Sequence, residues 1–164
     1  MTMSTLGILR DYATLIAACI AAVGVIIALF AYLANKNNQR EALVQRAYFD
    51  YAKMAVEKPE LAFPANQKLN FQNQTFNGDA LEFERYEWFV SSMLATVHFI
   101  SRVERSSKHW HEMMINQVAY HWRYIEHFRM TKLYLQNWDK ELTKILDEGL
   151  ARGRARYNGP SPEA

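Results

Sequence analysis

Residues that break helices or form disulfides are scarce in this sequence. It has six glycines, four prolines and one cysteine among 164 residues. A single cysteine excludes a disulfide within the chain, and no Gly-rich phosphate loop occurs. The formal net charge is only +2. This implies no large basic surface and argues against nucleic acid as a partner.

Charge is absent from one long stretch near the N-terminus. Residues 12–33 read YATLIAACIAAVGVIIALFAYL, and the next charged residue is Lys36. About 22 residues of helix cover about 33 Å, enough to cross the ~30 Å hydrocarbon layer of a bilayer. Backbone amides in lipid must pair internally, so an inserted segment is helical. We predict a transmembrane helix over 12–34 after a short head over 1–11, with membrane lipid as a partner.

Two alternatives to a retained anchor can be weighed. A cleaved secretory signal has a shorter apolar core, about 7–15 residues, that ends at small residues, whereas this stretch ends with Phe30, Tyr32 and Leu33. Residues 15–19 are similar to the lipobox of bacterial lipoproteins, in which the cysteine is lipidated. The chain stays apolar after Cys19, however. The length of the segment favours the retained anchor.

Flanking cations predict the orientation of the anchor. Arg10 precedes it, and Lys36, Arg40, Arg46 and Lys53 follow it. The positive-inside rule therefore predicts a single-pass protein of the inner (cytoplasmic) membrane, with the N-terminus outside and the C-terminal domain in the cytoplasm.

Small residues recur along the predicted span at alternating steps of three and four. This spacing places them on one stripe of the helix, and small residues allow two membrane helices to approach closely. The stripe is either a packing face or an accident of an Ala-rich span. We expect a helix-packing face, for self-association or for docking on another membrane helix, formed by Ala17, Ala21, Gly24, Ala28 and Ala31.

The remaining chain predicts one small helical domain over 35–152. Aromatic residues make up 13% of the sequence, so the domain can bury a core and is not a disordered tail. The predicted fold class is all-α: one N-terminal transmembrane helix followed by an antiparallel bundle of about four helices. These helices cover about 40–57, 79–105, 108–130 and 138–152, with an irregular loop over 59–78 and a disordered tail over 153–164.

The helix over 79–105 has the clearest pattern. Asp79 and Glu82 resemble a capping box, and Trp88, Phe89 and Leu94 broaden its apolar stripe. That stripe, at helical spacing, consists of Phe83, Tyr86, Val90, Met93, Val97 and Ile100.

Caps and breakers delimit the other helices. Pro59 should end the first helix of the domain, Ser106 or Ser107 can cap the third, and Asn137 can cap the last. Gly149 and Gly153 should weaken the end of that last helix. Its expected core residues are Leu142, Ile145, Leu146 and Leu150.

Catalytic motifs are not found. His109 and His111 are two residues apart, and His121 and His127 are six apart, so each pair diverges around a helix. No Glu-x-x-His pair, His-Glu-x-x-His helix or Gly-x-Ser-x-Gly elbow occurs. We therefore predict no catalytic, cofactor-binding or metal-ligating residues, no cofactor and no enzyme activity.

The chain resembles a diffuse group of uncharacterised bacterial single-pass membrane proteins. The resemblance rests on the N-terminal span, PELA at 59–62, YEWFVSSML at 86–94 and WHEMMINQVAYHWRYI at 110–125. This resemblance implies a small cytoplasmic helical domain, and it identifies no catalytic residues.

These observations predict a non-enzymatic, membrane-anchored scaffold or regulatory module that self-associates through its transmembrane helix. One alternative is an accessory subunit whose small-residue stripe docks on a foreign membrane helix. A second is a metal protein or enzyme that uses the histidines at 109–127. The expected partner is thus another protein or a second copy of the chain, and a small-molecule partner stays unknown.

Overall fold

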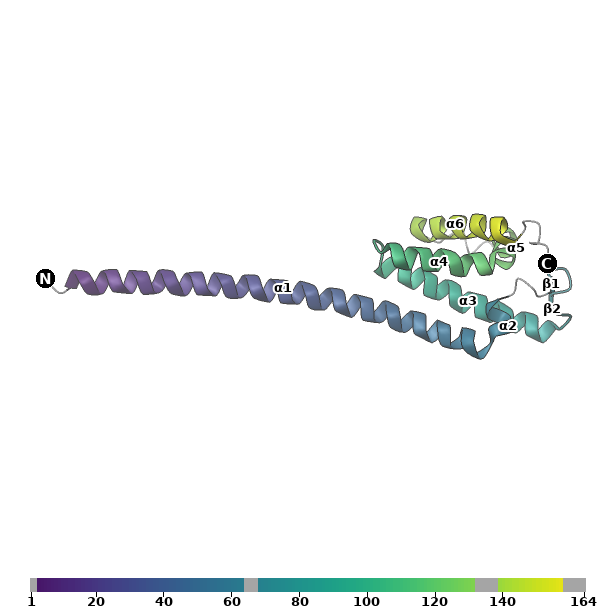
Figure 1. The fold of residues 1–164 in the computed structure, drawn as a ribbon, viewed down its shortest axis with the longest axis horizontal. Coiled ribbons are helices and arrows are strands. Elements are labelled where there is room, and N and C mark those ends of the chain that lie inside the picture. Colours follow the sequence, from purple (N-terminus) through teal and green to yellow (C-terminus); the bar gives the residue numbers. More distant parts are fainter. Residues whose placement is uncertain (1–2, 64–67, 132–138, 158–164) are drawn as a thin grey trace. The chain divides into compact units, whose positions relative to one another are not determined.

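The structure is a computed structural model that describes residues 3–63, 68–131 and 139–157. The described chain is mostly helical, as predicted, and begins with one long apolar helix. Its elements are α1 (Met3–Glu57), α2 (Pro59–Ala62), β1 (Leu69–Asn70), β2 (Thr75–Phe76), α3 (Ala80–Val103), α4 (Lys108–Tyr120), α5 (Trp122–Thr131) and α6 (Lys140–Tyr157) (Figure 1). By their contacts, residues 1–42 and 43–164 form two separate units.

Helix α1 joins the predicted span and the first predicted helix of the domain in one continuous helix. It includes the predicted span over 12–34, the predicted helix over 40–57 and residues 3–11 of the predicted head. No proline or glycine lies between the two predicted helices, so nothing in the backbone interrupts them. The helix ends at Glu57, and the backbone of Lys58 (φ −135°, ψ 65°) lies outside the helical region ahead of Pro59. The expected stop at this proline is confirmed.

The segment over 59–78 is more regular than the predicted loop. Pro59 begins the short helix α2, and β1 pairs with β2 in an antiparallel hairpin with Leu69 opposite Phe76. Asn70 Oδ1 accepts hydrogen bonds from the backbone of Gln72 and Asn73. The amide-rich sequence thus forms turns, and the buried Phe76 attaches the hairpin to the core.

Helix α3 lies at the centre of the unit formed by residues 43–164. Its N-cap is Asp79, whose carboxylate accepts hydrogen bonds from the backbone of Leu81 (2.7 Å) and Glu82 (3.2 Å). All six residues of its predicted stripe are buried, as are Phe89 and Leu94. Trp88, which was expected to broaden the stripe, is instead 70% exposed.

The predicted helix over 108–130 is divided at His121. Helix α4, capped by Ser107, ends at Tyr120, and α5 begins at Trp122. No glycine or proline marks this break in the sequence. The imidazole of His121 is buried against Tyr86 and Phe89 of α3. We attribute the break to this packing, which overrides local helix propensity.

Helix directions depart from a wholly antiparallel bundle. Helix α4 starts just after α3 ends, and its last turn lies near the first half of α3, so this pair is antiparallel. Helices α4 and α6 run parallel, because residue numbers rise together along their contacts, from His111 with Glu148 to Tyr120 with Tyr157. The reversal at His121 makes this possible, since α5 carries the chain back.

Two glycines set the close approach of α4 and α6. A Cβ atom placed on Gly149 would lie 2.4 Å from Val118 Cγ1, and one on Gly153 would lie 2.8 Å from the backbone oxygen of Ala119. Sequence reasoning expected these glycines to weaken the helix end. Helix α6 instead continues to Tyr157, so residues 153–157 of the predicted tail are helical. Residues 158–164 and the predicted cap Asn137 lie outside the described residues.

Candidate functional site

The predicted packing face lies on an uncovered part of α1. Ala17, Ala21, Gly24, Ala28 and Ala31 are all exposed. Apart from the neighbouring backbone of α1 itself, no atom of the described residues lies within 4 Å of a Cβ atom placed on Gly24. These residues share one stripe of a continuous helix, and a close approach by a second helix would meet no obstruction at Gly24.

The same stretch of α1 is long and apolar enough to cross a membrane, and none of its most apolar window is buried. Large side chains such as Ile20, Val25 and Phe30 are more than two-thirds exposed. The core helix of a soluble protein would be covered by its own chain, and this one is not. A signal sequence also passes the test of length and composition.

The five histidines are separated in the structure. His98 Nε2 lies 3.5 Å from Asp139 Oδ2, and His111 Nε2 lies 3.0 Å from Glu148 Oε2. His127 stacks on Phe71 of the hairpin, and His109 packs edge-on against Trp110. Among the described residues, no three His, Cys, Asp or Glu side chains are placed to hold one metal ion.

His121 differs from the other histidines because it is fully buried. Its Nδ1 lies 3.0 Å from the hydroxyl oxygen of Tyr86, whereas its Nε2 has no hydrogen-bond partner within the described chain. Burial lowers the pKa of His121 to about 3, and burial also raises the pKa of Tyr86. The pair is therefore neutral near pH 7, which suits a structural contact between α3 and the α4–α5 break.

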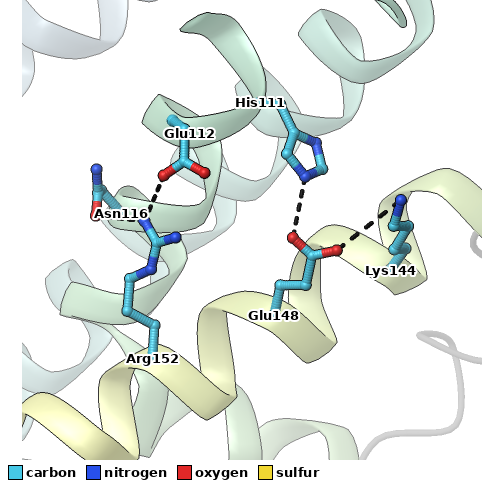
Figure 2. A network of polar contacts seen from close by, with 6 residues as sticks. All are labelled: His111, Glu112, Asn116, Lys144, Glu148 and Arg152. Carbon is cyan, nitrogen blue, oxygen red and sulfur yellow. Dashed lines mark hydrogen bonds and ion pairs between the residues drawn. The ribbon is translucent and has the colours of Figure 1, made fainter. Parts of the chain in front are cut away.

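A polar network runs along the parallel α4–α6 pair (Figure 2). Glu148 accepts a bond from His111 and faces Lys144 at 4.0 Å. One turn further along α6, Arg152 donates to Glu112 (2.8 Å) and to the side-chain oxygen of Asn116 (3.0 Å). The bond from Arg152 lowers the pKa of Glu112. The two glutamates thus tie neighbouring turns of α4 and α6 together on the surface.

Beside this network is a pocket of about 390 Å³ where the α3–α4 connection faces the start of α6. Arg105 and Lys108 line it from the connection and the first turn of α4, and Lys144 lines it from α6. Sequence reasoning missed this pocket. Its cations come from segments more than 30 residues apart, and only the parallel arrangement of α4 and α6 brings them together.

A second pocket, of about 360 Å³, lies between the end of α1, α2 and α3. It is more apolar, with Met54, Leu61, Trp88 and Phe89 among its lining residues. The exposed Trp88 stands at this pocket instead of in the core.

Comparison with known proteins finds no matching family model, no similar curated protein and no similar solved structure. The resemblance to bacterial single-pass membrane proteins therefore stays a prediction.

Proposed function

We propose that the protein is a membrane-anchored interaction module without enzyme activity, in which residues 12–34 cross the membrane and mediate self-association. The observation that carries the proposal is that no residue in the most apolar window of α1 is buried. Leaving this surface in water is unfavourable by about 25 cal/mol per Å² of apolar area. A bilayer removes that cost without requiring a protein partner over the whole helix.

The small-residue face supports self-association within the membrane. Between helices in lipid, attraction comes from close packing and not from the hydrophobic effect, because the lipid is equally apolar. Gly24 and Ala28 are four residues apart and exposed, so their backbones can approach a second helix. The excess of Lys and Arg after the span favours an orientation with residues 43–164 in the cytoplasm.

The proposal is tested by changing the face without changing apolarity. Gly24→Leu and Ala28→Leu should each convert the oligomer of the full chain in mild detergent towards monomer, measured by sedimentation equilibrium. Ile26→Leu is the matched control, because residue 26 lies about 200° around the helix from both positions. All three variants should remain in membranes after a carbonate wash.

Two results would count against self-association. One is a wild-type chain that is monomeric across the accessible concentrations, and the other is an oligomer that both leucine variants leave unchanged. If a foreign membrane protein instead copurifies with the wild type and is lost in both variants, the stripe serves an accessory subunit.

A further inference from the structure

The pocket at the start of α4 and α6 combines positive charge from three places. Arg105 belongs to the α3–α4 connection, Lys108 is the first residue of α4, and Lys144 lies in the second turn of α6. Its volume of about 390 Å³ falls within the range of small-molecule sites, about 300–1,000 Å³.

Ion pairing within the described residues leaves the charges of Arg105 and Lys108 uncompensated, while Lys144 faces Glu148 at 4.0 Å. Of the described carboxylates, none forms an ion pair with Arg105 or Lys108. The lining also contains two carboxylates, Glu112 and Glu141. Glu112 is bonded to Arg152, which does not line the pocket. Glu141 is therefore the one lining carboxylate without a cation bonded to it in the described structure.

Other polar groups make the same pocket suitable for an oxyanion. His111 lines the wall and is oriented by its bond to Glu148. Ser106 lines the floor of the pocket with its neighbour Ser107. Because α4 and α6 are parallel, the positive ends of both helix dipoles also face this region. The dipoles add to the positive field of the pocket, whose two unpaired cations in the described part of the chain are Arg105 and Lys108.

We propose that this pocket binds a phosphate group, held by Arg105, Lys108 and Lys144. Arginine and lysine form charge-assisted hydrogen bonds with phosphate oxygens, and a phosphate monoester carries enough charge to outweigh the repulsion from Glu141. The site goes beyond the proposed function, because it lies wholly within residues 43–164 and does not require self-association. Its ligand is either a small soluble phosphate ester or the headgroup of an anionic phospholipid.

The test is a calorimetric titration of the full chain, in uncharged detergent, with inorganic phosphate. The Arg105→Gln, Lys108→Gln double variant should weaken binding by about tenfold or more, because it removes two of the three cations that would hold the phosphate. Glu141→Gln should strengthen binding, because it removes repulsion. Lys53→Gln is the matched control: it removes one exposed cation of the same unit that does not line the pocket.

Two further titrations separate the sources of the phosphate. Binding of glycerol phosphate with the same variant pattern assigns the site to a soluble ester. Binding of phosphatidic acid in mixed micelles with that pattern, but not of glycerol phosphate, assigns it to a lipid headgroup.

The proposal fails if the wild type shows no saturable binding of any of the three probes at millimolar concentrations. It also fails if Lys53→Gln weakens binding as much as the double variant, or if Glu141→Gln weakens it. Thermal unfolding of each variant, measured without phosphate, controls for damage to the fold.

Discussion

The apolar side chains of residues 14–42 are exposed, whereas most of those described within residues 43–157 are buried or partly buried. Both regions share helix α1, yet within the second region Val44 and Tyr51 are buried and Tyr51 donates a hydrogen bond to Gln117 (2.8 Å). In the first region Ile16, Ile20 and Phe30 contact nothing that covers them. The difference shows that the surroundings of α1 change along its length. Its first part is not covered by the rest of the described chain, and its last part belongs to the core.

The two regions also use small residues differently. At Gly24 the space beyond the helix is empty, while at Gly149 and Gly153 it is filled by Val118 and Trp122. Each of the two small residues in the core already packs against a side chain of the same domain. On the exposed helix, no described residue fills the corresponding space at Gly24.

Acid should produce the largest difference in stability between the two regions, because the core contains His121 and the exposed helix contains no histidine. The unfolded imidazole takes up a proton near pH 6.5, whereas burial holds its pKa at about 3 in the folded state. Stability is therefore full above about pH 6.5 and falls as pH decreases towards 3. Each pH unit in this window costs about 1.4 kcal/mol, so pH 4.5 should cost about 2–3 kcal/mol relative to pH 7.

The measurement is thermal unfolding of the full chain in detergent at several pH values, monitored by near-ultraviolet circular dichroism. A His121→Leu, Tyr86→Phe variant removes both members of the buried pair, so no hydroxyl loses its partner. Its stability should change much less between pH 7 and 4.5. An equal loss in the wild type and this variant would show that another group causes the acid sensitivity.

A matched pair of glycine substitutions should have the next largest effect. Gly149→Ala places a methyl group against Val118 and should destabilise residues 43–157 by about 1–3 kcal/mol. Gly24→Ala meets open space and should leave that stability unchanged. Chemical denaturation of the two variants compares them directly, and equal stabilities would mean that α4 and α6 do not pack as closely as described.

Sequence pattern predicted what depends on neighbouring residues in the chain. The apolar period of α3 identified its buried face from Phe83 to Ile100, and Asp79 identified its start. The four expected core residues of α6 are also buried. These features follow from helical spacing and capping, which act over a few residues.

Features that depend on tertiary contacts could not be predicted in this way. The break at His121 has no local signal, because it arises from packing against Tyr86 and Phe89. Gly149 and Gly153 suggested a weak helix when considered alone, although in the fold they pack against Val118 and Trp122, which leave no room for a Cβ atom. The cationic pocket requires the parallel α4–α6 pair, which the sequence does not show.

The central claim is that residues 12–34 lie in lipid while residues 43–157 fold outside it. Cys19 tests this most directly, since it is the sole cysteine and lies in the proposed span. In native membranes it should react with a water-soluble maleimide only after the membrane is dissolved and the chain denatured. A cysteine introduced by Asn38→Cys in a Cys19→Ser background should already react with the maleimide in opened, undissolved membranes. Equal labelling of both positions in opened, undissolved membranes would contradict the account.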